Sequence, residues 1–424
     1  MNLNIEALSK TTLFKHFSDY FLFTFLLLII TIFSMLKLYQ EYLDLKRFTW
    51  HTQNATVMSE STFIKQSQIL TRYKLKTNTF TFYTTSHESM RPLEGREVSV
   101  AIKTDAISFI AYVKGFYASS KFIGLYHEQN FRLLLLKKIA ENHDSKMIAN
   151  LYGALYLAQS IQKNLRNKLS HLGINHLAAI SGFHLGFISF FILLFAHLVY
   201  KPLHQRYLPF RNRSKDVMIV TIIILFAYVA LLDFTPSLLR AFGMILIGFI
   251  LYDRGMKIVS FASLSVTVLL LLALFPDLLF TLGFWLSVLG VFMIFLLLQH
   301  FSHLKKWQLF LLLHWLVFIL MIPFIIFIFK EVSMGQLLSP LLSMVFILFY
   351  PLSVFLTAIG FGNALDGILI WLLSWDFKSI DIYVSTTTIV IYTGLLLASI
   401  WSKKLFYVNV IVLHVCFVYF WSLS

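Results

Sequence analysis

One stretch decides the fold of this chain: His176-Leu177-Ala178-Ala179-Ile180-Ser181-Gly182-Phe183-His184-Leu185-Gly186-Phe187. It opens an uncharged run, 177–200, that is long enough to cross the hydrocarbon core of a bilayer as a helix. Two histidines, a serine and two glycines are unusual in such a run, because polar groups are costly there and small residues let helices approach closely. The stretch therefore predicts a specialised helix of a polytopic membrane protein.

The composition of the whole chain leads to the same class. Of its 424 residues, 58% are hydrophobic and 13% are charged, and the mean hydropathy is +0.77, whereas soluble domains carry roughly 25% charged residues. The net charge of +15 fits basic loops that set topology, and equally an attraction to anionic lipid or nucleic acid. Cys416 is the only cysteine, so the chain forms no internal disulfide.

Weakly charged runs predict an α-helical membrane protein with about ten transmembrane helices, at 20–36, 177–200, 217–232, 236–252, 258–275, 278–299, 307–329, 332–365, 382–402 and 405–421. The first is interpreted as a retained helix rather than a removed signal peptide, because no small-residue cleavage site follows it. The run 332–365 contains Pro340 and Pro351 and is too long for one straight crossing, so a break is expected there. The stretch 366–381 fits either a surface helix or a short crossing.

Residues 38–175 differ in kind from the rest. They hold 18 Lys and Arg against 10 Asp and Glu, a net charge of +8. Residues 80–83, 98–103 and 109–114 have the pattern of strands. A small β-rich domain over 38–130 fits an OB-fold-like barrel, a frequent binder of single-stranded nucleic acid, or a cap without ligand specificity. Leucines at mostly three- and four-residue steps predict an amphipathic helix over 146–172, within a set of surface helices at 131–175.

Basic residues set the expected topology. Five of them crowd one short loop, which predicts that this loop is cytoplasmic: Lys201, Arg206, Arg211, Arg213 and Lys215. Counting back one helix from this loop places residues 38–175 outside the cytoplasmic membrane. The first segment, 1–37, then consists of a cytoplasmic N-terminus and the first transmembrane helix. Counting forward places 253–257 and 300–306 inside, whereas the side on which Lys403 and Lys404 lie stays open.

The stretch 176–187, called the opening stretch from here on, closely resembles the His-Leu-x-Ala-Ile-Ser-Gly-x-His block of the ComEC competence family. Three weaker blocks follow in that family's order. Thr-Pro-Ser-Leu-Leu-Arg-Ala at 235–241 resembles Ser-Pro-Ser-x-x-Arg-Ala, and Pro276 with Gly-Phe-Trp-Leu-Ser at 283–287 resembles Asp-Pro…Gly-Phe-Gln-Leu-Ser. Phe275 and Trp285 replace the two polar residues of that block, so their roles do not carry over. The stretch 332–351 resembles the family's Val-Ser…Asn…Pro block, with Ser343 in place of Asn.

The resemblance implies a channel in the cell inner membrane that passes single-stranded DNA into the cytoplasm during natural transformation. It implies an OB-fold before a competence core at 176–424, and a form without the family's C-terminal metallo-β-lactamase-like domain, since no His-x-His-x-Asp-His motif occurs. The chain also lacks Gly-x-x-x-x-Gly-Lys-Ser/Thr, so the expected partners, besides DNA and membrane lipids, are a DNA receptor, a nuclease and a cytoplasmic ATPase or helicase. An oligomer is compatible with this reading, and no cofactor is expected.

The residues expected along the DNA path are His176, Ser181, Gly182, His184, Gly186, Ser237, Arg240, Gly283, Phe284 and Ser287. On a regular helix the two histidines lie about 80° apart, without a nearby Cys, Asp or Glu, so no metal site is expected. They instead bond to neighbouring backbone or line a polar path, while Ser181 and Gly182 permit a local break or a close helix contact. Arg240 either reaches the headgroups or faces inward toward phosphates.

Two other functions remain open. A secondary transporter or flippase for an anionic small molecule or lipid also uses broken helices and an intramembrane arginine. An intramembrane hydrolase would use Ser181 with His184, three residues apart, but no orienting acid or oxyanion-hole motif accompanies them. No catalytic residue is therefore expected.

Overall fold

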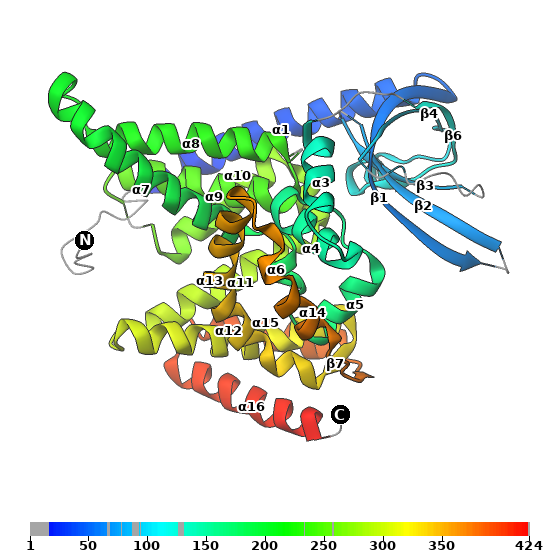
Figure 1. Ribbon diagram of the computed structural model, residues 1–424. Coiled ribbons are helices and arrows are strands. Elements are labelled where there is room, and N and C mark those ends of the chain that lie inside the picture. The colour runs from blue at the N-terminus through cyan, green and yellow to red at the C-terminus, as the bar shows by residue number, and fades with distance from the viewer. Residues whose placement is uncertain are drawn as a thin grey trace.

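The computed structural model describes residues 17–65, 68–77, 79–86, 93, 95–125, 131–232, 234–256 and 258–422. A small β-barrel lies at one end of a body of helices (Figure 1). Helix α1 (Phe17–Lys46) runs along the body, packs against α10 (Phe261–Leu274) and leads directly into the barrel. The barrel is thus attached to the body both through the chain and through side-chain contacts.

The barrel is built from β1 (Trp50–Lys65), β2 (Gln68–Lys76), β3 (Thr81–Ser86), β4 (Glu97–Lys103), β5 (Phe116–Tyr117) and β6 (Ser120–Leu125). β1 pairs with β2 and with β4, and β2 pairs with β3, all antiparallel. β5 pairs in parallel with β3, β6 pairs antiparallel with β4, and only two residues separate β5 from β6. One stretch of chain therefore joins both edges of the sheet and closes it. Among the fully buried interior side chains are Val57, Leu75, Phe82, Val100 and Ile102.

The predicted strands at 80–83 and 98–103 are confirmed as β3 and β4. The strand predicted at 109–114 is wrong: these residues form helix α2 (Phe109–Lys114). Ser108 caps its start by accepting the N–H of Ala111 at 3.3 Å, and Gly115, with a φ of 83°, ends it. Local capping thus outweighs the weak strand preference of the four aromatic and branched residues in this segment. The long strands β1 and β2 lacked a clean alternation and were not predicted.

Counted over the described residues, six segments of the chain are long and apolar enough to cross a membrane. They comprise α1, α7 (Gly182–Tyr207), α8 (Arg213–Leu231), α11 (Leu282–His300), α12 (Lys306–Phe329) and Met334–Ala358, which contains α13 (Ser339–Ala358). Shorter apolar helices include α10, α14 (Asp366–Ser374) and α15 (Thr386–Ala398); α9 (Pro236–Asp253) and α16 (Lys403–Ser422) complete the body. The chain is a multi-pass membrane protein.

The run 332–365 is broken, as its length and Pro340 predicted, whereas Pro351 lies inside α13 and does not interrupt it. The run begins with β7 (Glu331–Ser333), continues as the 3₁₀ turn η2 (Met334–Leu338), and only then forms α13, with Pro340 in its first turn. After α13 come the 3₁₀ turn η3 (Gly362–Leu365), helix α14 and strand β8 (Ser379–Asp381), which pairs with β7. The stretch 366–381 is therefore a short helix followed by a strand.

Three helices connect the barrel to the opening stretch: α3 (Phe131–Glu141), α4 (Lys146–Leu157) and α5 (Lys163–His171). The single helix predicted over 146–172 is wrong, because the chain turns at Ala158, which has a left-handed φ of 52°. Asn150 stabilises the turn by donating to the Ser160 carbonyl at 2.9 Å and accepting the Gln162 N–H at 3.0 Å. Apolar residues of α4 and α5 share one cluster with α7, α8 and α13, so these helices pack as part of the body.

Two hydrogen bonds fix the end of the helical body at which Lys403 and Lys404 lie, which the sequence had not determined. Gln299 Nε2 donates to the Ile400 carbonyl at 2.9 Å, and His300 Nε2 donates to the Ser399 carbonyl at 2.8 Å. The turn before α16 therefore lies beside the last turn of α11, at the same end of the body as the loop 300–306.

Candidate functional site

The opening stretch lies at a break between α6 (Asn175–Ala178) and α7. Helix α7 begins at Gly182, with Ser181 in an extended conformation as its N-cap. His184 Nδ1, three residues further on, accepts the backbone N–H of Ser181 at 3.1 Å. The structure thus contains the local break expected at Ser181 and Gly182, and one histidine bonds to neighbouring backbone. Because the helix is interrupted, the 80° separation expected for the two histidines does not apply.

His184 is completely buried. Its ring packs edge-on against Tyr350, with ring centroids 4.5 Å apart, and against Phe346 at 5.4 Å, both in α13. Ser181 Oγ also lies 3.1 Å from His184 Nδ1, but His184 Nε2 has no hydrogen-bond partner among the described residues, so no acid orients the ring as in a hydrolytic triad. Capping of α7 accounts for this serine–histidine contact.

His176 contacts the same helix at a different place. Its Nε2 lies 3.5 Å from Ser343 Oγ of α13. Nearby, the Ser339 hydroxyl donates to the Gly173 carbonyl at 2.9 Å, and Gly173 has a φ of 69°, with Gln336 packed against it. The block 332–351 thus packs on the entry to the opening stretch, although Gly173 and Ser339 are 166 residues apart. The described residues contain no group of three or more His, Cys, Asp and Glu side chains that could hold a metal ion.

Arg240 joins α9 to α11. Helix α9 begins as predicted, with Thr235 as N-cap and Pro236 in its first turn. The Arg240 side chain is 5% exposed, and its Nη1 donates to the Gly283 carbonyl at 2.7 Å. Its Nε has no hydrogen-bond partner among the described residues. Arg240 is therefore a buried cation bonded to the first turn of α11, which is not the extended conformation of a side chain reaching for headgroups.

The three expected glycines differ in what surrounds them. A Cβ at Gly182 would lie 3.4 Å from the Ala241 Cβ, an ordinary van der Waals contact. A Cβ at Gly186 or Gly283 would meet nothing within 4 Å. Close packing within the chain therefore does not require glycine at these positions, and only at Gly182 would an added Cβ meet a neighbouring helix.

The remaining path residues occupy different environments. Phe284 is 1% exposed and packs in an apolar cluster with Leu271 and Leu278, so it is part of the core. Ser287 is half-buried on α11, one turn further on. The side chain of Ser237 lies outside the described residues.

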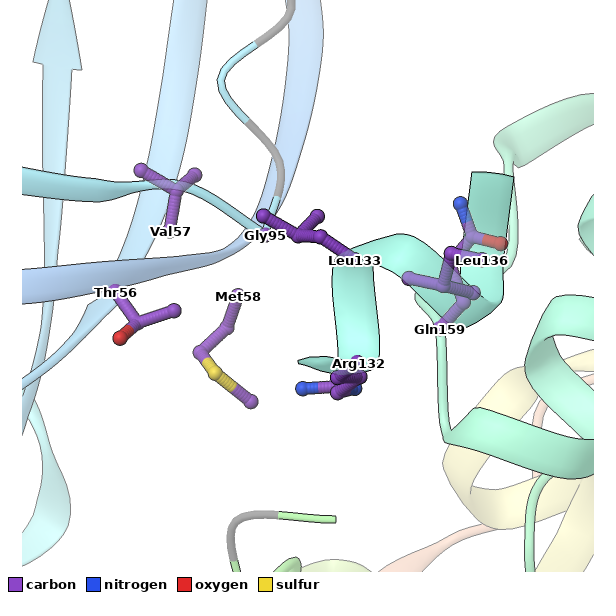
Figure 2. Close-up of a pocket in the computed structure, with 8 residues that line it drawn as sticks. All are labelled: Thr56, Val57, Met58, Gly95, Arg132, Leu133, Leu136 and Gln159. Carbon is purple, nitrogen blue, oxygen red and sulfur yellow. The ribbon is translucent and has the colours of Figure 1, made fainter. Parts of the chain in front are cut away.

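The barrel rests beside the start of α11. Lys114 of α2 lies over the Phe280 ring, 4.9 Å from its centroid, in the 3₁₀ turn η1 (Pro276–Phe280) that leads into α11. A second contact joins Gly95 to Leu133 of α3: Gly95 has a φ of 78°, and a Cβ there would come within 2.6 Å of Leu133 Cδ2. Figure 2 shows this seam, where residues of β1 and α3 line a cavity of about 30 Å³. The block 276–287 therefore connects the barrel with Arg240.

One outer face of the barrel combines aromatic rings with cations. Lys74 of β2 lies opposite Tyr83 of β3, which in turn lies opposite Tyr117 of β5. The rings of Tyr83 and Tyr117 stack with centroids 5.4 Å apart, Lys74 lies over Tyr83 at 5.8 Å, and Arg72 lies over Tyr117 at 5.4 Å. Tyr117 is 55% exposed. We call Arg72, Lys74, Tyr83 and Tyr117 the tyrosine face.

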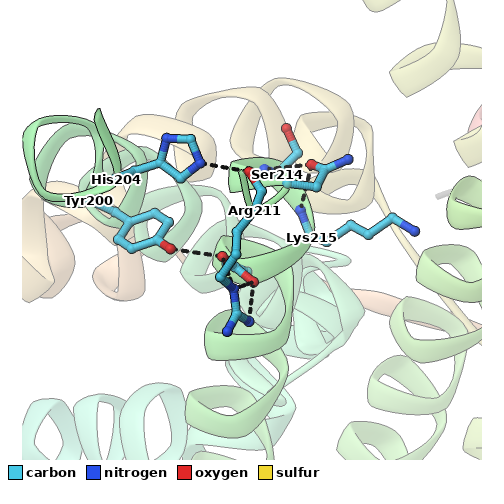
Figure 3. Close-up of polar contacts among 7 residues, drawn as sticks. Tyr200, His204, Arg211, Ser214 and Lys215 are labelled. Carbon is cyan, nitrogen blue, oxygen red and sulfur yellow. Dashed lines mark hydrogen bonds and ion pairs between the residues drawn. The ribbon is translucent and has the colours of Figure 1, made fainter. Parts of the chain in front are cut away.

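The basic loop between α7 and α8 is partly neutralised (Figure 3). Asp216 accepts hydrogen bonds from Tyr200 at 2.7 Å and from Arg211 at 2.7 Å. Outside this view, Lys215 pairs with Asp253 of α9 at 2.6 Å. Within the part of the chain that the structure describes, Lys201, Arg206 and Arg213 form no ion pair. These bonds tie together the end of α7, the start of α8 and the end of α9, at the end of the body away from the barrel (Figure 1).

Two long-range contacts that the sequence did not reveal fix α14 to the linker helices. His143, buried and stacked on Tyr152 with centroids 4.3 Å apart, bonds through Nδ1 to Asp366 at 2.9 Å. Lys168 Nζ donates to the Leu373 carbonyl at 2.6 Å, at the last turn of the same helix. The partners are 223 and 205 residues apart, and no local spacing marks them.

The architecture defines a class: a multi-pass helical membrane protein with broken helices, a buried arginine and a β-barrel at one end. The profile of the family described as Competence protein matches residues 157–423, and the chain belongs to this competence family. No curated protein matches the chain, and no solved structure matches it.

Proposed function

We propose that this protein is a channel that carries single-stranded DNA across the cytoplasmic membrane during natural transformation. Membership of the competence family, over most of the body, indicates a role in DNA uptake. The observation that carries the finer assignment is that distant blocks of the sequence meet on α9. Ala241 of α9 lies against Gly182 of α7, and Arg240 of α9 bonds to Gly283 of α11, beside the turn that the barrel contacts. The chain thus joins an external receiving domain to a polar break in the membrane.

We propose further that the barrel is an OB-fold. If β5 and β6 are counted as one fifth strand, the strands pair in the order β1, β2, β3, β5/β6, β4 and back to β1. A small barrel of five strands is typical of the OB-fold. Oligonucleotides bind the OB-fold on the face of its second and third strands. Arg72, Lys74 and Tyr83 of the tyrosine face lie on those two strands, and Tyr117 lies beside them on β5. The face offers two rings for base stacking and two cations for phosphates.

The proposed orientation places residues 38–175 outside and the basic loops inside, in an inner-membrane protein of about ten crossings. Basic residues at 201–215, 300–306 and 403–404 support it, because they gather at the end away from the barrel. The helices α9, α10, α15 and α16 supply four crossings besides those of the long apolar segments. The shortest of these cross only with local thinning of the bilayer or with the neighbouring turns.

Helix α13 is not counted as a crossing, because Ser339 at its start bonds to Gly173 and Gly362 just after its end lies beside Asn142, both in the linker of the outer segment. The nine crossings that remain place 403–404 on the same side as 300–306, as the hydrogen bonds there require.

The polar groups at the break would replace part of the water that phosphates lose on entering the membrane. A nuclease to degrade the second strand, a DNA receptor and a cytoplasmic ATPase or helicase are the proposed partners. No catalytic step is assigned to the chain itself, in keeping with a channel.

A deletion strain tests the proposal. We expect transformation to be lost while growth and the uptake of small solutes stay normal, with recovery on expression of the full chain. Transformation at the wild-type frequency would reject the channel. Normal transformation together with impaired movement of an anionic solute or lipid would favour the alternative, a secondary transporter or flippase, which the buried Arg240 also fits.

A further inference from the structure

The first turns of three helices meet at Arg240. Helices α7, α9 and α11 all begin at the end of the body that carries the barrel. On α9, Ala241 lies against Gly182, the first residue of α7, while the adjacent Arg240 bonds to Gly283, the second residue of α11. Two consecutive residues of one helix therefore contact the opening turns of the other two.

This arrangement concentrates positive charge. The first turn of a helix leaves backbone N–H groups unpaired and carries the positive end of the helix dipole. The first turn of α11 is bonded to a guanidinium that is only 5% exposed, and the first turn of α7 lies against the next residue of α9, Ala241. Among the described residues, no Asp or Glu forms an ion pair with Arg240, including Asp277 of the neighbouring turn η1. A buried cation without a counter-charge is costly, so a ligand that supplies the charge would be strongly favoured.

The geometry also leaves hydrogen-bond donors and space for such a ligand. Nη1 of Arg240 is used by the Gly283 carbonyl, whereas the buried Nε has no partner, so the Nε side of the guanidinium remains for a planar oxyanion. Space is open at Gly283, where a Cβ would meet nothing within 4 Å, and both Gly182 and Gly283 are exposed. The glycines thus allow a ligand to approach the helix starts closely.

We propose that Arg240 and the first turns of α7, α9 and α11 form a binding site for a phosphate-type oxyanion. Resting on the channel function proposed above, the ligand in the working protein is a backbone phosphodiester of the incoming strand, held by the guanidinium fork and by unpaired N–H groups. The site binds one phosphate at a time and reads no base. It lies beside η1, which the barrel contacts through Lys114, so a strand leaving the barrel meets it first.

The test uses the full-length protein, purified in a zwitterionic detergent, and inorganic phosphate as the probe. The unfolding midpoint is measured against phosphate concentration at constant ionic strength, with chloride as the replaced anion. The variants are Arg240→Gln, Arg240→Lys and Arg240→Met. Arg254→Gln is the matched control, because it removes the same charge from an exposed position that caps the other end of α9.

We expect phosphate to raise the midpoint of the wild type and of Arg254→Gln over the same concentration range. Half-saturation should shift at least about tenfold higher in Arg240→Gln, and by less in Arg240→Lys, which keeps the charge but loses the fork. Arg240→Met should fold at least as stably as the wild type without phosphate, because it removes a buried charge, and should not respond to phosphate. An equal response in all variants, or none in the wild type, overturns the site.

Two further measurements separate the sources of phosphate. A short oligothymidylate should displace bound phosphate from the wild type, and phosphate should act equally well on protein in phosphatidylcholine nanodiscs. A phosphate effect that disappears in nanodiscs would mean that a lipid headgroup fills the site, which rejects the DNA assignment. The deletion strain tests the channel function independently. If transformation is lost but the protein shows no phosphate response, the phosphate site is rejected and the channel function stands. If phosphate binds but the deletion strain transforms normally, the channel function is rejected and the phosphate site stands.

Discussion

The tyrosine face of the barrel and the helix starts around Arg240 present cations in opposite ways. On the barrel, Arg72 lies over the exposed ring of Tyr117 and Lys74 over the half-buried ring of Tyr83. Each contact there contributes about 0.5–1 kcal/mol, and salt screens the attraction to phosphates. The charge of Arg240 is buried and bonded to the start of α11, where the low dielectric strengthens each interaction. The first region is suited to loose, salt-sensitive reception of a strand, and the second to a local grip on one phosphate.

If both regions contact the same incoming strand, the tyrosine face and the helix starts around Arg240 must both lie on the outer side of the membrane. In a Cys416→Ala background, single cysteines at Ser120, Leu208 and Lys404 should give an all-or-none map: residue 120 reacts with an impermeant thiol reagent from outside, and residues 208 and 404 react only from inside. Labelling in the absence and presence of membrane permeabilisation measures this. The reverse map would remove the proposed direction of transport.

Arg240 should dominate the transport function. Arg240→Ala leaves the Gly283 carbonyl and the helix starts without their cation, so transformation should fall at least about a hundredfold, whereas Arg240→Lys should lose less. Transformation frequency, normalised to the amount of protein in the membrane, is the measurement, with Arg254→Gln as the control. If Arg240→Ala inserts and transforms like the wild type, the buried arginine has no part in the route.

His184 should matter for the structure of the break. His184→Ala removes the acceptor for the Ser181 N–H and the contact with Tyr350, at an expected cost of about 2–4 kcal/mol in stability. His176→Ala is the comparison, because His176 is exposed and its polar contacts are a backbone hydrogen bond at Gly173 and a long contact with Ser343 at 3.5 Å, so it should lose only about 1 kcal/mol. Denaturation of both variants in detergent measures the difference, and equal losses would contradict the assigned roles.

The tyrosine face should control the affinity for single strands. The double variant Tyr83→Ala, Tyr117→Ala should weaken oligothymidylate binding by the full-length protein about tenfold, since stacking on one base contributes about 1–3 kcal/mol. Ile123→Ala, at a 60% exposed position of β6 outside this face, is the control. Fluorescence anisotropy at two salt concentrations measures both, and binding should weaken steeply with salt. Unchanged affinity in the double variant would move the receiving surface elsewhere.

Gly182 should show the smallest effect. Gly182→Ala is expected to stay within about 0.5 kcal/mol of the wild type, because its Cβ meets Ala241 at an ordinary 3.4 Å and alanine favours the helix. Gly182→Leu should impair DNA entry, because a longer side chain occupies the open side of the helix start. Membrane levels and transformation, measured together, separate packing from transport. Full transformation by Gly182→Leu would show that the space at Gly182 is not used.

The sequence by itself determined the features that depend on neighbouring residues. Hydropathy indicated the membrane class and the positions of most long helices, Pro340 marked the break before α13, and Pro236 marked the start of α9. The stretch 176–187 indicated the family that the match over 157–423 then showed. These succeed because capping, proline geometry and transfer to lipid are local properties.

Only the tertiary structure decided how those elements meet. The residues 109–114 read as a strand and form a helix, because Ser108 and Gly115 cap them and Tyr112 packs into the barrel. The pairing of one stretch, 116–125, with both β3 and β4 closes the barrel through contacts that no local pattern encodes. The same holds for Arg240 with Gly283 and for His143 with Asp366, where a buried polar group finds its partner across a long chain separation. Burial sets which pairs form, because each unpaired polar group inside the fold is costly, and burial is a property of the whole chain.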